Sequence, residues 1–316
     1  MSDILFIKTS SLGDVIHHMP ALTEARRARP DARLSWAVEE AFAPLVRLHS
    51  GVDEVIPVAW RRWRRSLYSP ATLGEIGNSL RSIRARRYDE IIDSQGLLRS
   101  AVMARVAKGR RQGYDSGSIR EPLASVFYDV RHNVSRESHA IERNRTLTAR
   151  ALGYTPRGAL DYGLDRASLM PKSGAAYAVL LHATARAEKQ WPEENWVALG
   201  KVMSSDGLDL VLPWGTDEER MRAQRMAAKL PAAHVGERQP LDATARLIAG
   251  ASLVVGVDTG LLHVAAALGV PLVAIFAGSQ PHLTGPVGNG PLVVLGASGE
   301  PPSVDEVTKG VEGLGL

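Results

Sequence analysis

Three polar segments carry residue types and spacings that could bind or transform a ligand: residues 8–14, 182–192 and 257–263. Each follows a short apolar run and precedes a longer amphipathic one, so each should connect a strand to a helix. In doubly wound α/β proteins the ligand lies beyond the carboxyl ends of the strands, at connections of this kind. We therefore expect the chemistry of this protein in these three segments.

The first segment ends in Gly13 and Asp14. Gly13 permits a tight turn and the close approach of a ligand to the backbone. Asp14 stands where the next helix begins, so its residue type fits a helix N-cap as well as a functional carboxylate. The segment is no P-loop, because the pattern G-x-x-x-x-G-K-[ST] is absent.

The other two segments suit a phosphate. Thr184 supplies a hydroxyl, and Arg186 and Lys189 supply cations near the end of a strand, although an ordinary solvated loop has the same composition. Thr259 and Gly260 begin an apolar helix, whose first N–H groups and positive dipole end favour an anion.

Two more side chains of the third segment have roles that the residue types leave open. Asp258 is negatively charged, so it fits the orientation of loops or a hydrogen bond to a sugar hydroxyl better than contact with a phosphate. His263 lies one turn into the predicted helix, where a structural and a ligand-binding role are about equally plausible.

A cluster of arginines surrounds Trp63: Arg61, Arg62, Arg64 and Arg65. Residues 61–111 contain 13 Lys and Arg but 4 Asp and Glu, a net charge of +9. Such a surface fits nucleic acid, or the phosphates and carboxylates of a glycolipid, which arginine binds in bidentate fashion. No zinc-finger, RNP or helix-turn-helix signature supports nucleic acid.

Composition and charge limit the function classes. The 316 residues include no cysteine, which excludes disulfides and thiolate chemistry. Residues 1–160 carry a net charge of +9 and residues 161–316 a net charge of −5, so the first half should attract an anionic partner. No apolar run reaches 18 residues, and the N-terminal run resembles no signal peptide. We expect a soluble cytoplasmic protein.

Alternating short apolar runs and amphipathic stretches predict an α/β protein with parallel sheets. Strands are expected at residues 4–8, 34–39, 54–58, 90–94, 112–114, 178–182, 208–213, 253–257, 271–276 and 292–295. Helices are expected at residues 15–29, 41–49, 72–87, 97–107, 136–152, 193–204, 217–229, 241–249, 261–268 and 303–311. The weakly periodic residues 153–174 separate two halves, which predicts domains 1–165 and 166–316.

Ten segments in consistent order resemble one family nearly from end to end. The chain is similar to the bacterial heptosyltransferases of lipopolysaccharide core synthesis, glycosyltransferase family 9, and most to the branch that adds the first heptose. The resemblance rests on residues 8–15, 38–40, 55–58, 61–64, 93–97, 120–125, 182–184, 189–194, 212–215 and 257–263.

The resemblance implies a GT-B fold, in which two Rossmann-like domains face a central cleft. Domain 1–165 would bind the acceptor and domain 166–316 the donor, and the C-terminal helix would pack back on the first domain. The implied reaction is an inverting, metal-independent transfer of L-glycero-D-manno-heptose from ADP-L-glycero-β-D-manno-heptose to the first Kdo of Kdo2-lipid A. The sibling branch that adds the second heptose, and a basic nucleic-acid-binding protein, are the alternatives.

The resemblance also implies site residues, with Asp14 as the catalytic base. The donor-binding positions are Thr184, Ala185, Lys189, Asp217 or Glu218, Gln239, Asp258, Thr259, Gly260 and His263. The expected acceptor-binding residues are Ser11, Gly13, Arg61, Arg62, Arg64, Arg65 and Arg120.

The chain departs from the family pattern at three donor positions. Ala185 stands where the family has a second threonine, Gln239 replaces an apolar residue, and the segment around Asp217 differs in length. We expect no cofactor, no metal and no nucleic-acid partner, and a monomer lying peripherally on the cytoplasmic face of the inner membrane.

Overall fold

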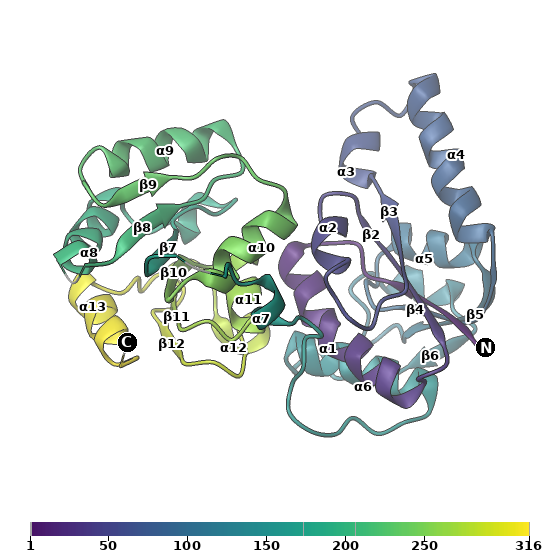
Figure 1. Ribbon diagram of the computed structural model, residues 1–316. Coiled ribbons are helices and arrows are strands. Elements are labelled where there is room, and N and C mark those ends of the chain that lie inside the picture. Colours follow the sequence, from purple (N-terminus) through teal and green to yellow (C-terminus); the bar gives the residue numbers. More distant parts are fainter. Residues whose placement is uncertain (1, 173, 206, 316) are drawn as a thin grey trace. The chain divides into compact units, whose positions relative to one another are not determined.

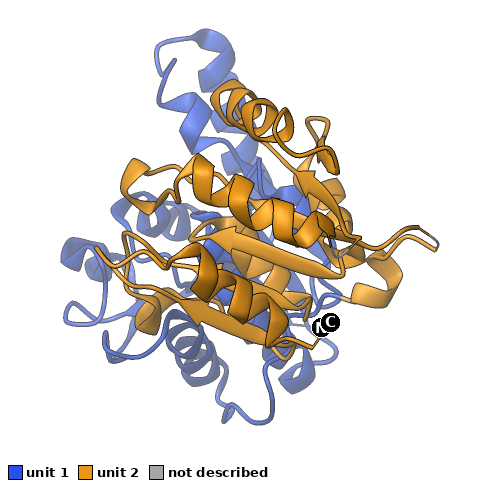
Figure 2. Cartoon of the chain, turned by 90° about the vertical axis from the view of Figure 1, so that its left-hand side faces the viewer, with its two compact units in different colours: residues 1–164 blue, residues 165–316 orange. Residues whose placement is uncertain are grey.

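The computed structural model describes residues 2–172, 174–205 and 207–315. The chain divides into two compact units, residues 1–164 and 165–316, which Figure 2 shows in different colours. The division lies within the weakly periodic stretch between residues 153 and 174. Each unit contains a six-stranded sheet, and each is described by itself below.

The strands of unit 1 form an entirely parallel sheet in the order β3-β2-β1-β4-β5-β6 (Figure 1). The order reverses between β1 and β4, which are hydrogen-bonded neighbours although six helices and strands separate them along the chain. The strand bounds are β1 Asp3–Ile7, β2 Arg33–Glu39, β3 Glu54–Val58, β4 Arg87–Asp93, β5 Lys108–Tyr114 and β6 Val130–His132.

Helices connect these strands and cover the sheet. The largest helix–helix contact of unit 1 joins α1 and α6, and the buried ion pair between Glu24 and Arg145 links them. The bounds are α1 Leu12–Ala28, α2 Ala43–Val46, α3 Trp60–Trp63, α4 Pro70–Arg84, α5 Leu98–Val106, the 3₁₀ helix η1 Pro122–Phe127 and α6 Ala140–Leu152.

Unit 2 repeats the topology of unit 1. Its sheet is also parallel, in the order β12-β11-β10-β7-β8-β9, so the order reverses between β7 and β10. Both sheets therefore have the strand order of a Rossmann fold. The strand bounds are β7 Tyr177–Leu181, β8 Asp209–Leu212, β9 Ala233–Val235, β10 Leu253–Val257, β11 Leu272–Ile275 and β12 Leu292–Leu295.

The C-terminal helix of unit 2 packs on α8, β11 and β12 of its own unit. The helix bounds are α7 Arg166–Leu169, the 3₁₀ helix η2 Ala187–Lys189, α8 Glu193–Ser205, α9 Asp217–Ala227, α10 Leu241–Gly250, α11 Gly260–Ala267, α12 Pro281–Thr284 and α13 Val304–Glu312. None of the helices in the described ranges is both long and apolar enough to cross a membrane.

The central strands are apolar on both faces because helices cover both sides of a doubly wound sheet. Residues 4–7 of β1 are at most 2% exposed, and all of β10 is buried. This is why short continuous apolar runs, rather than alternating ones, mark these strands in the sequence.

All ten strands and ten helices expected from the sequence are present, with ends that differ by a few residues. The expected helix at 41–49 is the short α2. Sequence reasoning missed β6 and β9, because each is a three-residue edge strand with a central His or Arg and no apolar run.

Candidate functional site

The carboxyl ends of β1 and β4 bring two loops of unit 1 together. β1 and β4 pair in register from Ile4 opposite Glu90 to Ile7 opposite Asp93. The amide oxygen of Gln95, just after β4, accepts hydrogen bonds from the backbone N–H groups of Thr9 and Ser10, at 2.8 and 2.9 Å. Gln95 therefore fixes the path of the loop that leads to Asp14.

Asp14 is the third residue of α1, and Ser11 is the N-cap. The Oδ2 atom of Asp14 accepts hydrogen bonds from the backbone N–H of Ser11 at 2.7 Å and from its hydroxyl at 3.0 Å. The N-cap is therefore Ser11, three residues before Asp14, and the N-cap position considered for Asp14 is wrong. The Asp14 carboxylate instead binds the N-cap residue from the third position of the helix, as in a capping box. In the described residues no hydrogen bond to Oδ1 is recorded, and the side chain is half-buried.

Buried charges surround this loop. Lys8 is buried and donates a hydrogen bond from Nζ to the backbone oxygen of Ser94, at 3.0 Å. Burial lowers the pKa of Lys8, the carboxylates of Asp14 and Asp93 oppose that effect, and the guanidinium of Arg120 adds to it. These couplings place the carboxylates of Asp14 and Asp93 and the guanidinium of Arg120 in the electrostatic environment of Lys8.

Asp93, the last residue of β4, organises the same edge. Its Oδ1 accepts hydrogen bonds from the N–H groups of Gln95 and Gly96, and its Oδ2 accepts one from the Tyr128 hydroxyl at 2.7 Å. Burial raises the pKa of Asp93, and these hydrogen bonds oppose the rise. Because its oxygens are already bonded inside the fold, Asp93 holds the loop of Gln95 in place rather than facing a ligand.

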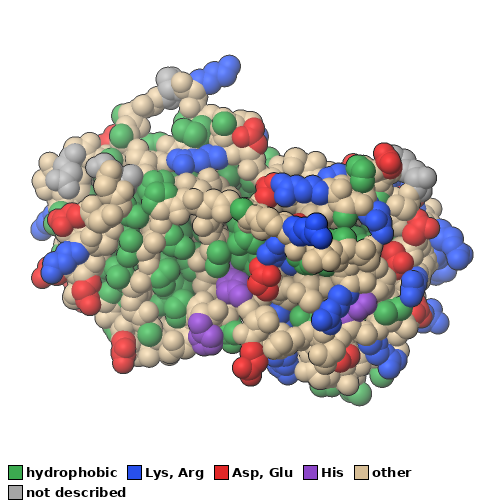
Figure 3. Space-filling view, turned by 90° about the horizontal axis from the view of Figure 1, so that it is seen from below, with side chains coloured by type: hydrophobic (Ala, Val, Ile, Leu, Met, Phe, Trp, Pro, Cys, Tyr) green, Lys and Arg blue, Asp and Glu red, His purple; other side chains and the backbone are tan. Residues whose placement is uncertain are grey.

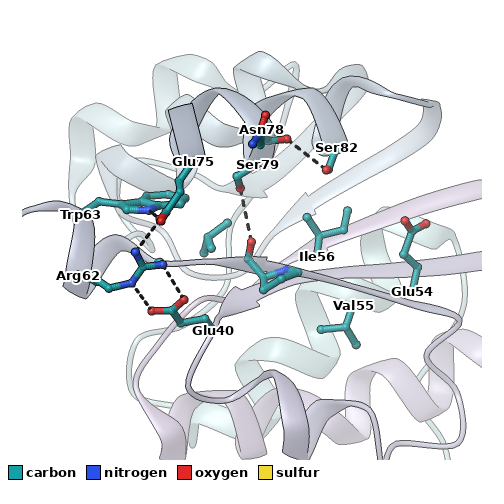
Figure 4. A pocket seen from close by; sticks show the side chains of 13 residues that line it. Glu40, Glu54, Val55, Ile56, Arg62, Trp63, Glu75, Asn78, Ser79 and Ser82 are labelled. Carbon is teal, nitrogen blue, oxygen red and sulfur yellow. Dashed lines mark hydrogen bonds and ion pairs between the residues drawn. The ribbon is translucent and has the colours of Figure 1, made fainter. Parts of the chain in front are cut away.

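The arginine cluster has unequal members. Figure 4 shows Arg62 between two carboxylates: its guanidinium bonds both oxygens of Glu40 at 3.0 Å and one oxygen of Glu75 at 2.6 Å. These hydrogen bonds raise the pKa of Arg62. Glu75 also accepts from the indole N–H of Trp63, so Arg62 fastens α3 to α4 beside a cavity of about 370 Å³.

The remaining arginines expected from the sequence are exposed: Arg61, Arg64, Arg65 and Arg120. The Arg61 backbone N–H donates to Glu39, and its guanidinium lies over the ring of Phe42, 5.1 Å from the centroid. For the described residues, no hydrogen bond or ion pair is recorded for the side chains of Arg64, Arg65 or Arg120. Ser11 is exposed at the N-cap of α1, and Gly13 is the second residue of that helix rather than part of a turn.

The second and third predicted segments meet at the carboxyl ends of β7 and β10. The Thr184 hydroxyl donates to the backbone oxygen of Asp258 at 3.0 Å, and Lys189 forms an ion pair with the Asp258 carboxylate. Both side chains of the pair are about one-seventh exposed. Thr184 and Lys189 of one predicted loop are therefore both in direct contact with Asp258 of another.

Ser279 joins this contact from the loop after β11. Its hydroxyl and the Lys189 ammonium bond the same atom, Oδ2 of Asp258. Burial alone would raise the pKa of Asp258, but the hydrogen bonds from Lys189 and Ser279 outweigh burial and leave that pKa below its ordinary value. Asp258 is thus a stable anion that orients one cation and one hydroxyl.

Two features hold the loop of Lys189 close to Asp258. A Cβ on Gly278 would lie 2.5 Å from the backbone oxygen of Glu188, so only glycine allows this approach. On the other side, Arg222 of α9 donates to the Gln190 side chain at 2.8 Å and to the backbone oxygen of Trp191. Trp191 is itself buried in the core of unit 2.

Helix α11 begins beside this cluster. Thr259 is its N-cap, Gly260 is its first residue, and His263, its fourth residue, is buried. Within the described part of the chain, the Thr259 side chain caps no N–H of the first turn. The positive charge of His263, when present, helps to lower the pKa of Asp258. The start of α11 thus presents N–H groups next to Lys189.

Four expected donor positions take no part in these contacts. Ala185 is exposed and, lacking a hydroxyl, offers no side-chain hydrogen bond. Asp217 and Glu218 are exposed in the first turn of α9, where the next residue, Glu219, caps the helix with Thr216. Gln239 is exposed and lines a groove of about 550 Å³ along α10, together with Leu169, Pro171, Tyr177 and Arg246.

Sequence reasoning missed Gln95, Ser279, Gly278 and Arg222 as residues that shape the two sites. The position of Gln95, directly after a predicted strand, was the available signal, because β4 lies next to β1 in a Rossmann order. Ser279 similarly follows a predicted strand, β11. Arg222 has no such signal in the sequence. It lies within a helix, and nothing in the local pattern predicts its hydrogen bond to the backbone oxygen of Trp191.

Charge differs between the units, as expected. Unit 1 contains 26 Lys and Arg and 18 Asp and Glu, whereas unit 2 contains 12 and 16. In Figure 3 basic side chains are spread over the visible face of unit 1, while apolar side chains occupy a larger share of the visible face of unit 2. Among the described residues, no group of three or more His, Asp or Glu side chains is arranged to hold a metal ion.

Comparison with known proteins agrees with this architecture. The model of the family described as "Glycosyltransferase family 9 (heptosyltransferase)" matches residues 76–310. Lipopolysaccharide heptosyltransferase 1 of Pseudomonas aeruginosa is 47% identical over 288 residues, 90% of this chain and 81% of that protein. The enzyme of the same name from Salmonella typhimurium is 44% identical over 289 residues, 90% and 91% of the two chains.

A solved structure described as E. coli heptosyltransferase WaaC with ADP resembles the chain over 99% of both lengths, with a TM-score of 0.93 and 39% identity. The chain therefore belongs to glycosyltransferase family 9, the heptosyltransferases, and is a glycosyltransferase. The α/β class and the two Rossmann-like sheets of the GT-B fold, expected from the sequence, are confirmed.

We predict that Ser279→Ala raises the pKa of Asp258, because one of the two hydrogen bonds that lower it is lost. Carboxyl-carbon NMR titration of Asp258 measures this directly. Ser279→Thr should keep the pKa low, and Ser168→Ala, which removes a hydroxyl elsewhere in unit 2, should leave it unchanged. An unshifted Asp258 in Ser279→Ala would show that the hydroxyl does not act on this carboxylate.

Proposed function

We propose that the protein transfers L-glycero-D-manno-heptose from ADP-heptose to the first Kdo of Kdo2-lipid A, with inversion at the anomeric carbon and without a metal ion. Unit 1 binds the acceptor and unit 2 the donor. The observation that carries the proposal is the pairing of Lys189 with Asp258 beside the start of α11, in a chain of the heptosyltransferase family.

Asp14 acts as the general base in this proposal. It accepts the proton of the Kdo hydroxyl while that oxygen attacks the anomeric carbon and the bond to the ADP oxygen breaks. One carboxylate suffices, because an inverting transfer needs no covalent intermediate on the enzyme. The geometry supports this role: Ser11 fixes Oδ2 of Asp14 and leaves Oδ1 on a half-buried side chain at the edge where ligands of this fold bind.

Lys189 and the first N–H groups of α11 stabilise the charge that grows on the departing diphosphate. Lys189 is held near its working position by Asp258, which Ser279 in turn orients. We assign Thr184, Thr259, Gly260 and His263 to the same end of the donor, where Ala185 offers the diphosphate no hydroxyl. Asp217 or Glu218, together with Gln239, is assigned to the rest of the donor.

The acceptor carries phosphates and Kdo carboxylates, which suit the exposed guanidinium groups of unit 1. We assign Arg61, Arg64, Arg65 and Arg120 to these anions, with Ser11 and Gly13 beside the base. Arg62 is assigned to positioning α3 instead, because Glu40 and Glu75 already bind its guanidinium.

A glycolipid acceptor also implies where in the cell the protein acts. The protein works as a monomer, peripherally on the cytoplasmic face of the inner membrane, where its acceptor is embedded. The related branch that adds the second heptose remains the alternative activity, and a nucleic-acid partner is not part of the proposal.

Incubation with ADP-heptose and Kdo2-lipid A should release ADP and yield a singly heptosylated product, detected by coupled ADP assay and mass spectrometry. Kdo2-lipid A that already carries one heptose should not be a substrate. Turnover of that second acceptor alone would instead establish the sibling activity, and salt-sensitive retention on DNA without turnover would support a nucleic-acid-binding protein.

Asp14→Ala should lower kcat by roughly 10²- to 10⁴-fold, the usual contribution of a positioned general base. Donor affinity, measured by calorimetry with ADP-heptose, should stay close to that of the wild type, because the donor binds to the other unit. Asp31→Ala, a change at an exposed carboxylate of the same unit, is the matched control. Near wild-type turnover of Asp14→Ala would refute the assignment.

Lys189→Ala should weaken ADP binding and transfer together, because a cation that contacts the diphosphate acts in both the ground state and the transition state. We expect a loss of about tenfold or more in each, in line with a charge-assisted hydrogen bond. Lys201→Ala, at an exposed site on α8, should change neither quantity. Unaltered ADP affinity in Lys189→Ala would contradict the role of Lys189 at the diphosphate.

A further inference from the structure

Two pairs of apolar side chains stand exposed on neighbouring elements of unit 1. Leu98 and Val102 of α5 are 40% and 47% exposed, and their spacing of four residues puts them on one face of the helix. Leu123 and Val126 of η1 are 69% and 63% exposed, and a spacing of three residues aligns them along a 3₁₀ helix. We call the surface formed by these four residues the α5–η1 face.

Hydrogen bonds hold the start of η1 against the start of α5. The Glu121 carboxylate, just before η1, accepts from the N–H of Leu98 at 2.6 Å, and the Glu121 N–H donates to the backbone oxygen of Gly96 at 3.2 Å. α5 and η1 are also in extensive contact with each other. The apolar side chains are therefore presented by fixed backbone rather than by a loose loop.

Basic side chains flank the apolar ones. Arg99 and Arg105 of α5 and Arg120 before η1 are all exposed. Residues 98–136 contain eight Lys and Arg against three Asp and Glu, and Glu121 is already bonded to the backbone of α5. An exposed apolar face rimmed by cations has the composition of a surface that lies in the headgroup region of an anionic bilayer.

The α5–η1 face adjoins the proposed acceptor site. Arg99, the second residue of α5, donates to the Ser10 hydroxyl at 2.9 Å, in the loop that leads to Asp14. A lipid-linked acceptor bound at that loop has its acyl chains in a bilayer, so the protein surface next to the loop must meet the bilayer too.

We propose that the α5–η1 face docks unit 1 on an anionic phospholipid bilayer, with Leu98, Val102, Leu123 and Val126 among the acyl chains and glycerol groups and with Arg99 and Arg105 on the lipid phosphates. The choice of a bilayer over a protein partner rests on the proposed function, because a lipid-linked acceptor brings the bilayer to this side of the unit. The face is separate from the residues assigned to chemistry, so docking can be measured without turnover.

The experiment is co-sedimentation of the full chain with vesicles that contain no acceptor. Vesicles of phosphatidylglycerol and phosphatidylcholine should bind the wild type, and phosphatidylcholine alone should bind it far less. Leu123→Asp/Val126→Asp should reduce the partition coefficient at least about tenfold, since two apolar anchors are replaced by like-charged groups. Arg105→Glu should reduce it as well, and raised salt should weaken binding of the wild type.

A matched control is available on the other unit. Val202 and Met221 are 40% and 53% exposed on α8 and α9, so Val202→Asp/Met221→Asp makes the same chemical change on a different surface. It should bind vesicles like the wild type. Circular dichroism and thermal melting should be alike for all variants, because every changed side chain is already exposed.

Equal vesicle binding by Leu123→Asp/Val126→Asp and the wild type would overturn the proposal, as would no binding by the wild type. Loss of a dimer in the variant, seen by sedimentation without any vesicle binding, would make the face a protein interface and would also overturn it. Turnover of a deacylated, water-soluble Kdo2 acceptor should be the same in variant and wild type. Absence of that turnover in both proteins would count against the proposed function while leaving the vesicle result intact.

Discussion

The reversal of strand order at the centre of each parallel sheet is the constraint on which both candidate sites depend. Between β1 and β4, and again between β7 and β10, neighbouring strands send their chains to opposite faces of the sheet. Their carboxyl ends lie side by side, at the point of the sheet where ligands of such folds bind. In unit 1 Gln95 after β4 holds the loop after β1, and in unit 2 Asp258 after β10 holds Lys189 after β7. The same topology thus places, at the same point of each sheet, one polar side chain that binds the neighbouring loop.

The two residues that hold these loops differ in charge, and so do the side chains that the loops present. Gln95 is neutral and binds backbone N–H groups, so the loop it holds can present the carboxylate of Asp14, of which Ser11 binds only Oδ2. Asp258 is an anion that binds a cation, so the loop it holds presents Lys189. Net charge is a poor guide to such detail: unit 2 is acidic as a whole, yet its site needs only one well-placed lysine and a helix start to favour a diphosphate.

The sequence allowed prediction of nearly the whole topology, because buried strands and amphipathic helices leave strong periodic signals. The edge strands β6 and β9 were not predicted, because three residues with a polar residue in the middle leave no periodic signal. Of the site, the three loops and Asp14, Thr184, Lys189 and Asp258 were predictable from their place after strands and from the family resemblance.

Tertiary partners could not be read from the sequence in the same way. Arg62 and Arg64 look alike in the sequence, yet Glu40 and Glu75 engage only Arg62 in the structure. Those carboxylates come from the loop after β2 and from α4, 22 positions before and 13 after the arginine. Ser279 reaches Asp258, and Arg222 reaches the loop of Lys189, for the same reason: long-range packing, not local pattern, brings them there.

In the proposed function, one physical constraint determines where the base, the cations and the apolar face lie within unit 1. A lipid-linked acceptor cannot leave the bilayer without exposing its acyl chains, at a cost of about 0.8 kcal/mol for each CH₂ group. Under the proposed function the carboxylate of Asp14 must therefore come to the membrane surface, and it can do so only if the elements beside its loop tolerate that surface. α5 begins next to that loop, and Arg99 joins the two. The proposal assigns the soluble nucleotide donor to unit 2, which then needs neither a basic surface nor a lipid-compatible face. Under the same proposal the charge asymmetry between the two halves of the chain follows from where each substrate resides.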